Sequence, residues 1–157
     1  MRVASAFVVL LLASFPNTLH ADGSSAAWKK FKGQVIVSDA PIRTEYESDK
    51  EMVEGLTKAR RDTLTRPKGA DAWEVHFVGF LAKKPGGAGL SVVLYDGKRQ
   101  FLTAKEIAVD ASAEILASSI EIGEDDGVKP GSRIEIVLGR KSGGKETVFA
   151  KTKVTLK

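Results

Sequence analysis

The sequence predicts a mainly β protein: an antiparallel β-sandwich of seven to eight strands with one helix inserted near the N-terminus. From Trp73 onward, apolar and polar residues alternate with the two-residue period of a β-strand. Turns rich in Gly and Pro interrupt this alternation at short intervals, as expected between strands of a sandwich. A convincing helical period occurs in one segment, at about residues 49–65.

Residues 1–21 have the layout of a cleavable signal peptide. Arg2 supplies a positive start, residues 3–15 are uncharged and apolar, and Ala21 is a small residue suited to cleavage. The apolar run is shorter than the roughly 20 residues that a membrane-spanning helix requires. No later run is long enough to span a bilayer, so we expect no integral membrane segment. We expect cleavage near Ala21, with Ala26 and Ala27 as alternative sites, and export to the periplasm or the exterior.

The amino-acid composition further limits the classes of protein to which this chain could belong. The chain contains no cysteine, so neither a disulfide nor a lipid-modified cysteine is available, and the apolar core alone has to stabilise the fold. Without Arg2, the 23 remaining Lys and Arg exceed the 20 Asp and Glu by three. This mild, interspersed positive charge argues against a nucleic-acid partner. After the signal, the length suits one domain that buries roughly two-thirds of its unfolded surface.

The first part of the predicted mature chain contains the helix. Residues 22–33 are small, polar and basic, and we interpret them as a flexible lead-in in which Trp28 and Phe31 could dock onto the domain. The domain spans 34–157, and its first strand is 34–38. Ser48 and Glu51 have the spacing of a reciprocal capping box, which predicts a helix start. The helical spacing of Met52, Leu56 and Ala59 follows, and the helix has to end before Pro67.

The strands follow from alternation and turn signals. Residues 73–81 are apolar on one face and partly apolar on the other, which predicts a central strand. Asp96 and Gly97 predict a hairpin turn, because glycine tolerates positive φ. In residues 147–156 we expect Val148, Ala150, Thr152, Val154 and Leu156 on one side. The remaining predicted strands are 90–95, 101–102, 106–109, 115–122 and 133–138.

Residues 128–138 resemble the corner before the penultimate strand of fibronectin type III and other immunoglobulin-like domains. In those families a Pro-Gly turn leads into a strand that carries a tyrosine; here Pro130 and Gly131 form the turn, and Ile134 stands near the tyrosine position. The resemblance covers about a dozen residues and implies an immunoglobulin-like sandwich. It implies no function, because this fold serves many functions.

The residues suited to catalysis or metal binding form no recognisable set. His76 is the one histidine outside the signal, and no Gly-x-Ser-x-Gly motif accompanies it. With one histidine and no cysteine, a zinc site is unfavourable, and we expect no cofactor. The acids Glu121, Glu124, Asp125 and Asp126 are the densest group of oxygen ligands but lack EF-hand spacing. They could bind a cation or could simply be solvated.

These observations favour an exported, non-catalytic module that binds a protein or a surface polymer. The basic helix carries Arg60 and Arg61, which we expect to form an electropositive surface with Lys68 beyond its end. Trp28 and Tyr46 lie in segments where exposure is expected. Two alternatives remain open. One is a carbohydrate-binding module that uses the aromatic residues. The other is a small hydrolase that depends on His76.

Overall fold

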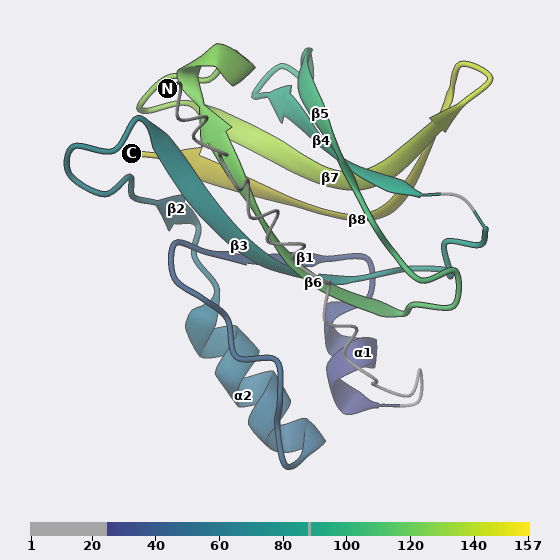
Figure 1. Cartoon of the computed structure of the whole chain (residues 1–157). Helices are drawn as coiled ribbons and strands as arrows, with labels where there is room; N and C mark the ends of the chain where they lie inside the picture. The colour runs from purple at the N-terminus through teal and green to yellow at the C-terminus, as the bar shows by residue number, and fades with distance from the viewer. Residues whose placement is uncertain (1–24, 88) are drawn as a thin grey trace, which may run out of the picture.

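The computed structural model describes residues 25–87 and 89–157. The predicted signal peptide and its expected cleavage site near Ala21 lie outside these residues. Eight strands in the described chain form two sheets (Figure 1). The three-stranded sheet has the order β1 (Val35–Ser38), β3 (Ala72–Phe80) and β6 (Ile115–Gly123). The five-stranded sheet has the order β2 (Thr63–Leu64), β8 (Lys145–Leu156), β7 (Arg133–Ser142), β4 (Leu90–Asp96) and β5 (Phe101–Ile107).

Neighbouring strands are antiparallel, except that β2 runs parallel to β8. The prediction of a mainly β chain is therefore confirmed, and so is the central position of β3, which pairs with β1 and with β6. The predicted strands at 101–102 and 106–109 are instead one strand, β5.

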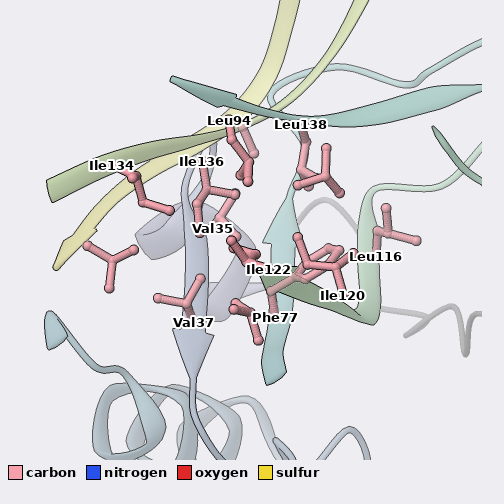
Figure 2. Close-up of a cluster of buried hydrophobic side chains, with 14 of the residues drawn as sticks. Val35, Val37, Phe77, Leu94, Leu116, Ile120, Ile122, Ile134, Ile136 and Leu138 are labelled. Carbon is pink, nitrogen blue, oxygen red and sulfur yellow. The ribbon is translucent and has the colours of Figure 1, made fainter. Parts of the chain in front are cut away.

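The main core lies between the two sheets. On β3, Trp73, Val75 and Phe77 point into it, as the two-residue period predicts. Figure 2 shows side chains from both sheets meeting there, among them Phe77 from one sheet and Leu138 from the other. Gly79 also lies on the inner side of β3, and a Cβ atom at this position would stand only 2.2 Å from Leu138 Cδ1. The absence of a side chain at Gly79 therefore permits the close approach of the sheets.

Two helices cover the outer face of the three-stranded sheet (Figure 1). In α1 (Ala26–Phe31), Phe31 packs against Phe80, with ring centroids 5.3 Å apart. In α2 (Asp49–Ala59), Leu56 is fully buried. Side chains of the two helices and of the outer side of β3 form a second apolar cluster. Burial in this cluster explains why the outer side of β3 carries apolar residues. Residues 26–31 of the predicted lead-in thus form the helix α1, and Phe31 docks on the sheet.

The start of α2 is as predicted, but its end is not. Ser48 Oγ accepts a hydrogen bond from the Glu51 amide at 3.2 Å, whereas the Glu51 carboxylate accepts one from the Glu47 amide at 2.8 Å and not from Ser48. The helix ends at Ala59, six residues earlier than predicted. A contact with a segment distant in the sequence ends the helix. The Arg61 amide donates to the Val37 carbonyl at 2.9 Å, so the chain leaves the helix and runs beside the sheets.

The two sheets are joined along one side, where β1 meets β8. Gln34 forms a parallel bridge with Lys151, whose amide donates to the Gly33 carbonyl at 3.1 Å. The Ala82 amide donates to the Phe149 carbonyl at 2.7 Å in the same region. Because backbone hydrogen bonds cross from one sheet to the other, the outer faces of the sheets form one continuous surface at this seam.

The hairpin of β7 and β8 contains a bulge, which changes the predicted alternation. The register shifts between Leu138 and Gly139, so Phe149 is an extra residue on β8. Val148 consequently lies with Val93 and Val137 on the outer face of the five-stranded sheet rather than on the Ala150 side. The predicted common face for residues 148–156 is wrong at this one position, because sequence alternation alone does not reveal a bulge.

Candidate functional site: a cationic band and its groove

Chain segments that carry positively charged residues meet on the outside of the seam. Gln34 connects the two helices at this point: its Nε2 donates to the Lys30 carbonyl at 3.2 Å, and its Oε1 accepts from Arg60 Nη1 at 3.1 Å. Its bridge partner Lys151 lies opposite Val137 on the outer face. We call the following five residues the cationic band: Lys30, Arg60, Lys151, Lys153 and Arg133.

The band has an excess of positive charge. Lys151 Nζ lies 3.8 Å from Glu135 Oε1. The other four members have no ion-pair partner within residues 25–87 and 89–157. Asp62 is a further acid beside this surface, and its carbonyl accepts from the Thr155 amide. Cations without acidic partners on one surface create a positive potential that attracts anions from solution.

One end of the band opens into a groove of about 320 Å³ on the outer face of the five-stranded sheet. The turn between β4 and β5 forms one wall, and β7 and β8 form the floor. The lining residues are Asp96, Gly97, Arg99, Arg133, Ile134, Glu135, Lys151 and Lys153.

The turn that forms the wall is held by Asp96. One oxygen of its carboxylate accepts hydrogen bonds from the amides of Lys98 at 2.8 Å and Gln100 at 2.7 Å. The predicted hairpin at Asp96 and Gly97 is confirmed, but the residue with positive φ is Arg99, at 64°, and not Gly97. This backbone conformation lies at the groove, where it positions the Arg99 side chain against β7.

Glu135 is the unusual residue of the floor. It is only 6% exposed although it lies on the outer face of the sheet. Its Oε2 is 3.7 Å from Arg99 Nε and its Oε1 is 3.8 Å from Lys151 Nζ. Both separations exceed hydrogen-bond length, and the described residues donate no hydrogen bond to this carboxylate. A buried carboxylate of this kind is expected to take hydrogen-bond donors from solvent or from a ligand.

A rigid network borders the groove. The Tyr95 hydroxyl is hydrogen-bonded to the Glu146 carboxylate, and Arg99 Nη2 lies 3.4 Å from the same side chain. Burial of the ring, followed by the hydrogen bond to Glu146, raises the pKa of Tyr95 to about 12. Phe101, the Cα partner of Tyr95, meets it edge-on and remains 54% exposed.

The structure separates the residues that the sequence singled out. Arg60 belongs to the band. The guanidinium of Arg61 is turned back onto α2, where it donates to the carbonyls of Lys58, Ala59 and Arg60. Lys68 is exposed in the turn between β2 and β3.

The two aromatic candidates do not form an exposed row. Trp28 and Tyr46 are half-buried and pack at the edge of the helix cluster. Lys32 Nζ lies 4.4 Å from the centre of the Trp28 ring, and the Arg43 guanidinium lies 5.1 Å from that of Tyr46. These rings therefore act mainly in packing the helices.

The sequence placed Lys151 and Lys153 on the outer side of the last strand, but it identified neither these lysines nor Arg133 and Glu135 as site residues. The available signal was their position between core residues on β7 and β8, which marks them as outward-facing. The seam that brings two of them to Gln34 and α2 has no local sequence signal.

His76 lies on the outer face of the three-stranded sheet. Its Cα partners are Ser38 and Ser119, and its Nε2 is 3.3 Å from Glu74 Oε1. Within the described chain neither serine hydroxyl is hydrogen-bonded to the imidazole, and Ser38 Oγ accepts from the Ala40 amide. Among the described residues, neither of these two serines is therefore paired with His76 as a nucleophile is with its base.

The acidic run after β6 is used in ion pairs at the end of the sandwich. In η1 (Glu124–Asp126), Glu124 binds Arg66 at 3.2 Å and Asp126 binds Lys105 at 2.9 Å. Burial alone would raise the pKa of Asp126, but hydrogen bonds from Lys105, Gly123 and Thr103 together lower it. Asp126 thus fastens the segment after β6 to β5, and among the described residues these acids converge on no common metal position.

No family model matches this sequence, and no curated protein and no solved structure matches it either. The described part of the chain contains no helix that is long and apolar enough to cross a membrane.

Proposed function

We propose that this protein is an exported, non-catalytic binding module for an anionic polymer of the cell envelope or surface. The observation that carries the proposal is the cationic band, in which four of five cations lack an acidic partner in the described chain. A polymer with repeated negative charges can contact several of these cations at once. A single pair of opposite charges at about 4 Å contributes roughly 1 kcal/mol in water, so several contacts are needed for firm binding.

Export is part of this proposal. It is supported by the basic start, the apolar run and the small residue Ala21 in residues 1–21. Periplasmic or extracellular location would place the band in contact with envelope polymers. Sequencing the N-terminus of the protein recovered from the native source tests this step, with a start near residue 22 as the expected result and an intact Met1 as the contrary one.

We also propose an immunoglobulin-like arrangement of the sandwich. If β2 is left aside and the others are lettered in chain order, the sheets are A-B-E and G-F-C with one more strand beside C. Immunoglobulin variable domains place their additional strands at the same edge. This order supports the resemblance that residues 128–138 suggest, although Ile134 replaces the tyrosine of that corner.

The binding proposal is tested by charge reversal in the exported protein. One variant carries Lys30→Glu, Arg60→Glu and Lys153→Glu. The control carries Lys50→Glu, Lys68→Glu and Lys84→Glu, which change the net charge equally on exposed positions outside the band. The probes are polygalacturonate and polyphosphate, and the dissociation constant is measured by isothermal titration calorimetry at several salt concentrations.

The band variant should bind at least about 100-fold more weakly, because three contacts worth roughly 1 kcal/mol each are lost and three repulsive charges are introduced. The control should change by less than about threefold, and binding by the unaltered protein should weaken with salt. Equal losses in the two variants would refute the role of the band. Tighter binding of duplex DNA than of either probe would refute the assignment to a surface polymer.

A further inference from the structure

We infer that the groove beside Glu135 holds an acidic sugar unit of the bound polymer, with sugar hydroxyls on Glu135 and the carboxylate or phosphate on Arg133 and Lys153. This inference rests on the proposed function, because it names the ligand class at one end of the cationic band. It follows from two features of the groove: a buried carboxylate that receives no hydrogen bond from the described residues, and cations that lack an acidic partner among them.

The negative group of the groove needs hydrogen-bond donors. The Glu135 side chain is more than nine-tenths buried, yet its nearest cations stand at 3.7 and 3.8 Å, and no described residue donates a hydrogen bond to it. An ionised carboxylate offers about four lone-pair positions, so two adjacent hydroxyl groups can donate to its two oxygens. Hydrogen bonds to a charged group are about twice as strong as those between neutral groups.

The cations around Glu135 decide which donor fits. An ammonium group of a ligand would enter between Arg99 and Lys151, both of which repel it. A hydroxyl group carries no net charge, donates to the carboxylate and can accept from the neighbouring cations. The site therefore favours a polyhydroxylated ligand over an amine.

The remaining cations select a negative substituent. Arg133 and Lys153 line the groove, and both are exposed and lack an acidic partner among the described residues. Because Arg133 pairs with Thr155, and Glu135 with Lys153, the two cations are diagonal neighbours on the outer face. An arginine fork beside a lysine suits a carboxylate or a phosphate.

The same row of residues extends toward an exposed aromatic ring. Phe101, Tyr95, Glu135 and Lys153 are successive Cα partners across β5, β4, β7 and β8. Strands lie about 4.8 Å apart, so Phe101 is roughly 10 Å from Glu135 along the row. A further sugar unit of the same chain can reach the Phe101 ring, which offers an apolar surface of the kind that sugar-binding proteins use.

The first measurement requires no variant. Isotope-labelled exported protein is titrated with trigalacturonate, glucose 6-phosphate, a neutral galactose trimer and polyphosphate, and backbone amide shifts are recorded by NMR. Both acidic sugars should shift the amide resonances of residues 133–135 and 151–153. Comparing their affinities then shows whether the groove prefers a carboxylate or a phosphate. The neutral trimer should bind at least about tenfold more weakly than trigalacturonate.

The second measurement uses Glu135→Gln, with Glu106→Gln as the control, since Glu106 lies exposed on β5 outside the groove lining. Glu135→Gln should weaken trigalacturonate binding by at least about tenfold. It should leave polyphosphate binding unchanged or tighter, because a negative charge has been removed. Glu106→Gln should leave trigalacturonate binding within about twofold.

The outcomes separate this inference from the proposed function. If polyphosphate binds at the band but neither acidic sugar moves the groove amides, the groove inference is wrong and the polymer proposal survives. Tighter binding of every anion by Glu135→Gln would likewise show that the groove inference is wrong, while the polymer proposal survives. If none of the anions binds, both are wrong.

Discussion

Replacing Gly79 by alanine tests the close approach of the two sheets. The new Cβ would stand 2.2 Å from Leu138 Cδ1, whereas carbon atoms in contact lie about 3.5–4.0 Å apart. Leu138 is fully buried and has to move by more than 1 Å, roughly, inside a densely packed core. Overpacking of this kind costs about 1–3 kcal/mol, and the better strand propensity of alanine offsets about 0.5–1 kcal/mol. We expect a net loss of about 1.5 kcal/mol.

Urea unfolding followed by tryptophan fluorescence measures this loss. For a slope of about 2 kcal/mol per molar urea, the midpoint should fall by roughly 0.7 M at an unchanged slope. Leu138→Val removes the atom that clashes, so the double variant should lose less stability than the sum of the single variants, by about 1 kcal/mol. Gly87→Ala is the control, because a Cβ there meets nothing within 4 Å. Strict additivity, or a stable Gly79→Ala protein, would refute the proposed packing of β3 on β7.

Two further predictions concern the groove network and the helix layer. Because burial and Glu146 raise the pKa of Tyr95 to about 12, ultraviolet titration should show one tyrosine ionising near that pH, and Tyr95→Phe should abolish this step. The neutral phenol is favoured in the folded state, so its stabilising contribution is complete below about pH 10 and disappears as the pH rises through about 12. Ser48→Ala should cost about 1 kcal/mol in urea unfolding and Ser48→Gly only a few tenths, since Ser48 caps α2; equal losses would exclude the capping role.

Part of the fold was accessible from residue patterns alone. The alternation of Trp73, Val75 and Phe77 predicted both the strand and its inward face, and the apolar residues between them predicted burial on the second side. Ser48 predicted the start of α2 because an N-cap is a local feature, made by a side chain and an amide three residues away. These features depend on near neighbours in the chain, so they can be deduced without knowing the fold.

Other features depend on contacts with distant segments. The composition of residues 26–31 predicted a lead-in in which Phe31 could dock, but not the helix α1, in which Ala27 and Phe31 are buried against a sheet face. The helix periodicity extended past Ala59, yet the Val37 carbonyl takes the Arg61 amide and ends the helix. The bulge at Phe149 moves Val148 to the other face, since the pairing with β7 shifts by one residue.

The candidate site shows the same division. Its charges could be counted in the sequence, and Arg60 was identified as part of an electropositive surface. The assembly of the site could not be deduced from the sequence, because Lys30, Arg60 and Lys151 come together only where Gln34 joins β1 to β8. The burial of Glu135 between two cations also depends on residues distant in the sequence, namely Arg99 in its turn and Lys151.

By itself, the sequence determined the β class, the inward faces of the main strands, the start of α2 and the lack of a disulfide. The tertiary structure decided where α2 ends, that residues 26–31 form a packed helix, and that five cations and one buried carboxylate share a surface. The physical reason is one of range. Side-chain period and capping act between residues a few positions apart, whereas the seam and the groove are created by hydrogen bonds and packing between strands far apart in the chain.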